Sequence, residues 1–347
     1  MLVRQPNFLG NPLQMSLASK PFDLDKAHII TMISNPVRYE SRYELFFPFQ
    51  EHILKSTPNL WVCEVQTGDR PFCVTEKDNP QHLQLRTIEE FWVKENALNL
   101  IAAKMATSRP DWGYVGWFDA DIEFTRRDWL SEMIHQLQVY HVIQCFETAT
   151  DLGPTGQAIN IHESFMSKYL KGGAPHPGDL SDDEEFYMQH GHPGYAWACT
   201  RKAWNTMGGL YDRSILGSGD RNMAYALIGR VEQSYNEAID ESYKRDLEDY
   251  QRECLLLGMD VGCMPGNILH AYHGPKQLRG YKSRWEILVD NKYDPDRDIK
   301  RDAQMLYQLT SRKPRLRDDI RNYFRVRDED SKSLSDKNGV KKNNMKF

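Results

Sequence analysis

Acidic residues follow an apolar segment near the middle of the chain. Residues 115–124 read VGWFDADIEF, which places Asp119 and Asp121 at the end of a predicted buried strand. Two carboxylates in such a place repel each other and lose hydration unless a cation joins them. Their oxygen atoms suit Mg²⁺ or Mn²⁺. A solvated loop whose aspartates cap a following helix accounts for the same residues equally well, so the tripeptide alone does not establish a metal site.

Two histidines and a group of cations lie far downstream. His270 and His273, in HAYHG, end a second apolar segment, where an imidazole can reach a metal that carboxylates already hold. A loop containing Gly and Pro follows directly. Its cations are close enough together to clamp phosphate groups, and they are Lys276, Arg279, Lys282 and Arg284.

A further carboxylate lies in the turn GSGD (217–220), which opens a predicted helix over 217–229. At a helix N-terminus, Asp220 is either a simple cap or a base presented to a pocket. We favour the base.

Apolar clusters that alternate with helical patterns must position these side chains. Such alternation predicts a parallel, layered α/β sheet, in which ligands gather beyond the carboxyl ends of the strands. In the first half we expect strands at 28–33, 60–65, 114–122 and 141–147, and helices at 43–54, 91–105 and 129–140. In the second half we expect a long loop over 148–194 with a solvated acidic segment at 181–185, a strand and short helix over 194–210, a charged helix over 231–257 and a strand over 260–274.

Composition excludes several classes of protein. The chain has 347 residues and a formal net charge of −5, which gives no overall electrostatic reason to bind nucleic acid or an anionic membrane. We find no secretory h-region and no run of about 18 apolar residues, so we expect a cytoplasmic protein with no integral membrane segment. The six cysteines include no CxxC pair, which argues against a zinc knuckle or a disulfide framework.

The motifs, taken in order, resemble a known family. DAD, GYAWACTRKAWNTMGGLYD (194–212), GSGD and HAYHG with its basic loop follow one another as in nucleotide-sugar glycosyltransferases of the GT-A fold. Within that fold the chain is similar to the bacterial and phage branch with a galactosyltransferase-like C-terminal region. One departure concerns the turn: family members often carry Gly-Glu-Asp, whereas here Ser218 and Gly219 precede the single acid Asp220.

The resemblance covers residues 27–325 and implies a Rossmann-like, mixed and mainly parallel sheet flanked by helices. It divides the chain into a nucleotide-sugar-binding half (27–150) and an acceptor and catalytic half (151–325). Residues 1–26 would form an N-terminal extension. Residues 326–347 are nearly devoid of apolar side chains beyond about Asp328, and we expect them to form a disordered tail.

The resemblance also implies roles for individual residues. Asp119, Asp121 and His273 would bind Mn²⁺ or Mg²⁺, with Asp119 acting through the water shell of the metal or at the ribose, and His270 would be the alternative imidazole. Asp220 would be the catalytic base, and Trp197 would lie under the acceptor. The donor nucleotide would be held by Asn35, Arg38, Glu64, Lys94, Asn96, Asp119, Lys276, Arg279 and Arg284.

The implied activity is metal-dependent transfer of a hexose from a nucleoside diphosphate donor, first of all a UDP-sugar, to an acceptor hydroxyl with inversion. A saccharide is the first acceptor to consider and a modified base in DNA the second. Two other functions stay open: a metal-dependent nucleotidyltransferase, which would release pyrophosphate, and a nucleotide-binding protein of the same fold without turnover.

Overall fold

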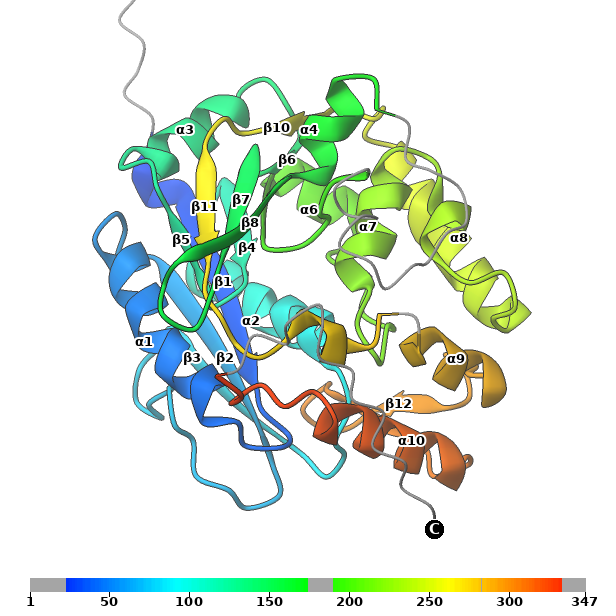
Figure 1. The fold of residues 1–347 in the computed structure, drawn as a ribbon. Coiled ribbons are helices and arrows are strands. Elements are labelled where there is room, and N and C mark those ends of the chain that lie inside the picture. Colours follow the sequence, from blue (N-terminus) through cyan, green and yellow to red (C-terminus); the bar gives the residue numbers. More distant parts are fainter. Residues whose placement is uncertain (1–22, 174–189, 282, 333–347) are drawn as a thin grey trace, which may run out of the picture.

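A seven-stranded sheet lies at the centre of the protein, whose computed structural model describes residues 23–173, 190–281 and 283–332 (Figure 1). Strand β9 is antiparallel to both of its neighbours, and the other pairings are parallel. This confirms the predicted mixed, mainly parallel sheet. In spatial order the strands are β10 (Val261–Cys263), β6 (Val142–Gln144), β9 (Ala196–Thr200), β4 (Tyr114–Phe118), β1 (Ala27–Ser34), β2 (Leu60–Thr67) and β3 (His82–Thr87).

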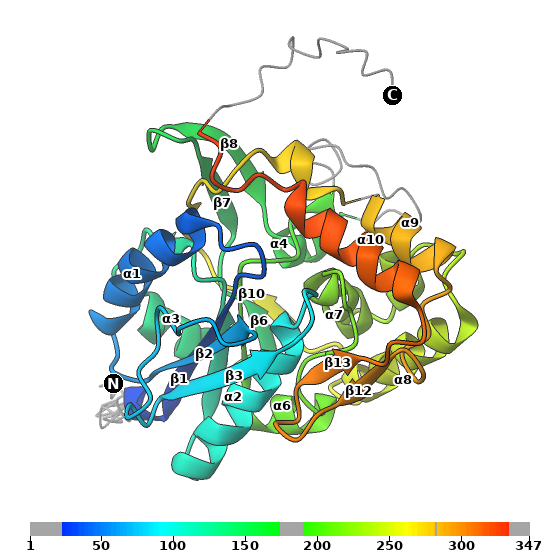
Figure 2. The ribbon, with the colours of Figure 1, turned by 90° about the horizontal axis from the view of Figure 1, so that it is seen from below.

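Helices cover both faces of this sheet, which is why its central strands read as continuous apolar runs (Figure 2). Ile29 of β1 packs in one core cluster with α1 (Glu40–Leu54) and α3 (Trp129–Gln136). Ile30, on the opposite face of the strand, belongs to a second cluster. That cluster contains residues of α2 (Lys94–Ser108), α6 (Arg201–Met207), α7 (Gly219–Leu227), α8 (Glu241–Leu255), α9 (Ser283–Asp290) and α10 (Pro314–Arg325).

A second sheet joins distant parts of the chain. Its order is β5 (Ile122–Phe124), β11 (Asn267–His270), β7 (Thr148–Leu152) and β8 (Ala158–Glu163). The antiparallel pairing of β5 with β11 sets Ile122 opposite His270. The turn that carries Asp119 and Asp121 is thereby placed beside HAYHG.

The long loop expected over 148–194 is wrong for most of its described part. Residues 148–170 form β7, β8 and α4 (Phe165–Leu170). Strand β7 is short and pairs with β11, far away in sequence, and local pattern does not report such a pairing. The acidic segment 181–185 lies outside the described residues.

Two other elements are shorter than expected. Residues 231–234 form a 3-10 turn, η2 (Val231–Ser234), and the charged helix begins only after Asp240, whose carboxylate accepts a hydrogen bond from Ser242 N at 2.9 Å. The strand expected over 260–274 divides at Pro265-Gly266 into β10 and β11, which belong to different sheets. The remaining elements are η1 (Leu24–Lys26), η3 (Lys276–Arg279), β12 (Ile299–Arg301) and β13 (Tyr307–Leu309).

The expected disordered tail begins too early. Residues 326–332 are described, and among them Arg327 is 6% and Glu329 only 2% exposed. The Asp330 carboxylate accepts hydrogen bonds from the backbone N–H groups of Glu40 and Ser41, at 3.0 and 2.9 Å, at the N-terminus of α1. Residues 333–347 and most of the N-terminal extension, 1–22, lie outside the described part. None of the described helices is long and apolar enough to cross a bilayer.

Candidate active site

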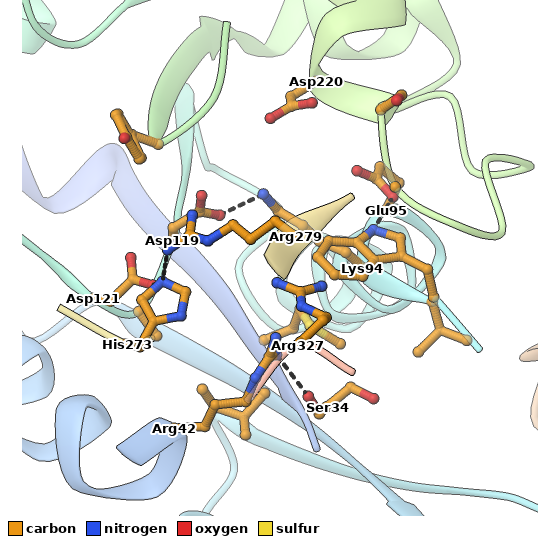
Figure 3. Close-up of a pocket in the computed structure, with 18 of the residues that line it drawn as sticks. Ser34, Arg42, Lys94, Glu95, Asp119, Asp121, Asp220, His273, Arg279 and Arg327 are labelled. Carbon is orange, nitrogen blue, oxygen red and sulfur yellow. Dashed lines mark hydrogen bonds and ion pairs between the residues drawn. The ribbon is translucent and has the colours of Figure 1, made fainter. Parts of the chain in front are cut away.

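A pocket opens where β1 and β4 of the main sheet end (Figure 3). Its walls come from segments that are far apart in sequence. The turn after β4 supplies Asp119 and Asp121, the start of α2 supplies Lys94 and Glu95, and the start of α7 supplies Asp220. HAYHG, the basic loop, α1 and the end of α10 complete the walls.

Three side chains form what we call the metal corner: Asp121, His270 and His273. One possible ligand atom from each lies within 4.8 Å of the others. The Nε2 atom of His273 is 3.1 Å, and that of His270 is 3.9 Å, from Asp121 Oδ2. A backbone hydrogen bond of 2.9 Å from Ala271 N to Asp121 O ties the two segments together. The sequence prediction that Asp121 and His273 meet is therefore confirmed in their geometry.

The donor set of the metal corner fits a divalent cation. Asp121 Oδ1 is buried and has no hydrogen-bond partner among the described residues, which is costly unless something else satisfies it. Burial opposes ionisation of Asp121, but the hydrogen bond with His273, the neighbouring His270 imidazole and the charge of Arg279 outweigh it and hold the pKa of this carboxyl below its ordinary value. One carboxylate and two imidazoles are ligands that Mn²⁺ accepts.

Asp119 lies apart from this corner, although the sequence suggested it as a ligand. Its carboxylate forms an ion pair with Lys94, and its backbone N–H donates to Tyr195 O at 2.8 Å. Burial alone would lower the pKa of Lys94, yet the carboxylates of Asp119 and Asp220 raise it above its usual value. Lys94 and Asp119 both line the pocket, so a contact of either with a donor remains a prediction.

Basic side chains also line the pocket, and one of them contacts the metal corner directly. Arg279 and Arg284 line the pocket as the sequence suggested, and Arg279 Nη2 lies 3.0 Å from His273 Nε2. Lys276 points elsewhere and forms an ion pair with the buried Asp151. Arg42 and Arg327 also line the pocket (Figure 3). Neither was expected from the sequence, because Arg42 belongs to α1 and Arg327 follows α10, and both lie outside every recognised motif.

Two acids stand on the opposite side of the pocket from the metal corner. Asp220, in the first turn of α7, accepts a hydrogen bond from Arg221 N at 2.8 Å. Glu95 is buried and accepts a hydrogen bond from Trp92 Nε1 at 3.2 Å. Burial raises the pKa of Glu95 to about 8, against the opposing effect of Lys94, so this carboxyl is largely protonated at neutral pH.

The backbone at Ser218 and Gly219 takes a conformation that brings the start of α7 close to Glu95. Ser218 has a φ of +75°, which costs free energy for a residue other than glycine and often marks a functional turn. A Cβ atom added at Gly219 would lie 2.4 Å from the Glu95 carboxyl group. The glycine therefore leaves the room that Glu95 occupies.

Four other predicted donor contacts do not line the pocket, and three of them are buried and bind groups of the protein itself. Glu64 accepts hydrogen bonds from the backbone N–H groups of residues 73–75 at 2.6 to 3.0 Å and so orders the loop after β2. Asn35 binds both backbone polar groups of Tyr39, and Asn96 binds Asp212 and Tyr307 N. Arg38 is exposed on the loop before α1.

Trp197, the predicted acceptor platform, is a residue of the core. It is 1% exposed, and its Nε1 donates to Pro193 O at 2.7 Å. It lines a second, smaller cavity together with Asp220 and Tyr195, so its contact with an acceptor remains a prediction.

Comparison with known proteins gave no family model and no curated protein that matches the chain. Similar solved structures include the catalytic domain of Drosophila beta1,4galactosyltransferase 7 in complex with xylobiose, at 10% identity and a TM-score of 0.31. A mutant of that enzyme with manganese, UDP-Gal and xylobiose gives 11% and 0.32. Each match covers 69% of this chain and 64%, slightly less than two thirds, of the other.

A protein from Desulfovibrio desulfuricans G20 that is provisionally described as a nucleotide-diphospho-sugar transferase gives 12% identity and a TM-score of 0.31. That match covers 86% of this chain and 97% of the other. Likeness at this level says nothing about residue roles, which must come from the site itself.

Proposed function

We propose that the protein is a divalent-metal-dependent glycosyltransferase that uses a nucleoside diphosphate sugar, first of all a UDP-sugar, as donor. The observation that carries this proposal is the meeting of Asp121, His270 and His273 in one pocket with the guanidinium groups of Arg279 and Arg327. Carboxylate and imidazole ligands beside several cations suit a metal-bound diphosphate better than any neutral ligand.

The metal corner would hold Mn²⁺ or Mg²⁺ through Asp121, His270 and His273. When bound, the cation supplies positive charge against the charge that grows on the departing diphosphate. Arg279, Arg284 and Arg327 would contact the oxygen atoms of the diphosphate and orient the donor. Lys94 and Asp119, already paired with each other, would contact the ribose or the phosphates from the side of α2.

Asp220 would act as the catalytic base. It would accept the proton of the acceptor hydroxyl while that oxygen bonds to the anomeric carbon of the donor, and the bond from that carbon to the diphosphate breaks. Attack from the side opposite the leaving group inverts the anomeric configuration. The position of Asp220 across the pocket from the metal corner supports this role. We propose a saccharide as acceptor.

The experiment is a thermal shift screen of nucleotide sugars with and without Mn²⁺, followed by analysis of the products. A true donor should raise the melting temperature only when the metal is present. Release of a nucleoside diphosphate would support transfer. Release of pyrophosphate would indicate a nucleotidyltransferase, and metal-dependent binding without any turnover would indicate a protein that only binds the nucleotide.

A further inference from the structure

The buried carboxylate of Asp151 lies behind His270. The Nδ1 atom of His270 is 2.8 Å from Asp151 Oδ1, while the Nε2 atom of His270 faces Asp121 Oδ2 at 3.9 Å. Asp151 is 1% and His270 is 4% exposed. Asp151 also accepts a hydrogen bond of 3.2 Å from the Tyr195 hydroxyl and pairs with Lys276. These contacts fix the carboxylate so that it engages the side of the imidazole that is turned away from Asp121.

A second buried carboxylate lies behind His273. The Nδ1 atom of His273 is 3.8 Å from Glu329 Oε2, and it has no hydrogen bond among the described residues. Its Nε2 atom faces Asp121 at 3.1 Å. Glu329 Oε1 lies 2.7 Å from both Arg42 Nη2 and Arg327 Nε, so the carboxylate is held in place.

The chain approaches HAYHG closely at this point. Gly274 has a φ of +83°, and a Cβ atom there would lie 2.7 Å from Asp328 O and from Glu329 Cα. The Ser41 hydroxyl donates to Glu329 O at 3.1 Å. The segment after α10 therefore lies against both α1 and HAYHG, which explains how Glu329, at the far end of the chain, reaches a histidine of the metal corner.

We propose that Asp151 and Glu329 are positioning residues of the metal corner, each facing the Nδ1 side of one histidine so that both Nε2 atoms point to the same cation. His270 can donate its Nδ1 proton to Asp151 and so keep the lone pair on Nε2 for the metal, and the negative charge of Glu329, 3.8 Å from His273 Nδ1, favours a proton on that nitrogen in the same way. This inference rests on the proposed function only for the presence of a cation. It adds that two segments outside every recognisable motif, β7 and the chain after α10, complete the site.

The test measures Mn²⁺ binding by the electron paramagnetic resonance signal of the free ion, with no substrate present. Asp151→Asn and Glu329→Gln should each weaken Mn²⁺ binding by about 10- to 100-fold, the usual cost of losing an outer-shell carboxylate. Glu329→Asp keeps the charge near Arg42 and Arg327 but withdraws the carboxylate from His273. It should weaken binding as well, which separates position from charge and serves if Glu329→Gln folds poorly.

Two control variants change the same segments without touching a histidine of the metal corner. Asp330→Asn removes the cap of α1, and Thr150→Val removes the hydroxyl of β7 that lies 3.1 Å from Asn267 Oδ1. Both should lower the melting temperature of the metal-free protein and leave the affinity for Mn²⁺ close to that of the wild type.

Wild-type affinity in the Asp151 and Glu329 variants would overturn this inference and leave the proposed function standing. A wild-type protein that binds no Mn²⁺ would overturn both.

Discussion

Two sides of one pocket treat charge in opposite ways. In the metal corner, Asp121 is held ionised beside two imidazoles, and its Oδ1 atom is buried without a hydrogen-bond partner in the described structure. We call the other side the acid wall (Lys94, Glu95, Asp119 and Asp220). Most of its ionisable groups are either paired with each other or neutral. Lys94 pairs with Asp119, and Glu95 is kept neutral by burial. The metal corner therefore has an unbalanced carboxylate that an added cation could neutralise, whereas the acid wall balances its charges among its own side chains.

Asp121 is the residue whose replacement should affect the metal corner most. Asp121→Ala removes the only carboxylate of the metal corner, so we expect Mn²⁺ affinity to fall by more than about 100-fold, beyond the usual effect of an outer-shell residue. The measurement is a Mn²⁺ titration followed by electron paramagnetic resonance. Asp119→Ala is the matched control, because Asp119 belongs to the same turn after β4 but its carboxylate pairs with Lys94. An equal loss of affinity in both variants would place Asp119 among the ligands and contradict the division into two sides.

The acid wall is tested by Asp220→Asn. Loss of a general base typically slows a reaction by about 10² to 10⁴-fold, and we expect that range for sugar transfer. The thermal shift produced by donor and Mn²⁺ together should be retained, because Asp220 belongs to the other side of the pocket. Transfer at the wild-type rate would show that Asp220 is not the base, and Glu95 would then be the next residue to test.

Arg327 tests whether the chain after α10 belongs to the site. Arg327→Ala should weaken donor binding by about 10- to 100-fold, since a charge-assisted hydrogen bond contributes roughly 1.5–3 kcal/mol. Isothermal titration with the donor in the presence of Mn²⁺ measures this. The control is Arg325→Ala, in the same segment, where the guanidinium pairs with Glu90 outside the pocket. Donor affinity that is unchanged in Arg327→Ala would remove this arginine from the donor site.

Sequence reasoning succeeded where local pattern and spatial position agree. Most strands of the main sheet were predictable because both of their faces are buried, which leaves continuous apolar runs such as HIITMI, whereas β3 (HLQLRT), which is buried only in part, was not expected from the sequence. Asp121, His270 and His273 were predictable as candidates for a related reason, because each lies at or just after the end of such a run, whereas the pairing of β5 with β11 that brings them together was not predicted.

The rest of the site depends on partners that no local pattern reveals. Asp151 belongs to a short strand, and Glu329 follows the last helix in a segment whose composition predicts disorder. Glu64 failed in the other direction. It lies near the end of the predicted strand 60–65 but inside β2 in the structure, where its carboxylate accepts hydrogen bonds from the backbone N–H groups of the loop after β2, and the composition of that loop did not indicate this. A carboxylate near the end of a predicted strand can thus order a neighbouring loop instead of binding a ligand.

The last prediction concerns the stability of the fold and the protonation state of Glu95 in the acid wall. The pKa of Glu95 is raised by burial from 4.5 to about 8 in the folded protein, so the folded state retains a proton that the unfolded state loses between these values. The contribution of Glu95 to stability is therefore fully present below about pH 4.5 and is lost as the pH rises to 8.

Glu95→Gln stays neutral throughout and keeps an acceptor for Trp92 Nε1. The variant should match the wild type near pH 4.5 and exceed it increasingly up to pH 8, by at most about 1.4 kcal/mol per pH unit, with no further gain above. Chemical denaturation across this range measures the difference, and Glu44→Gln, at an exposed position on α1, should show no such trend. A constant difference between Glu95→Gln and the wild type would mean that Glu95 is already ionised in the folded pocket, and the contrast between the two sides would then rest on Lys94 alone.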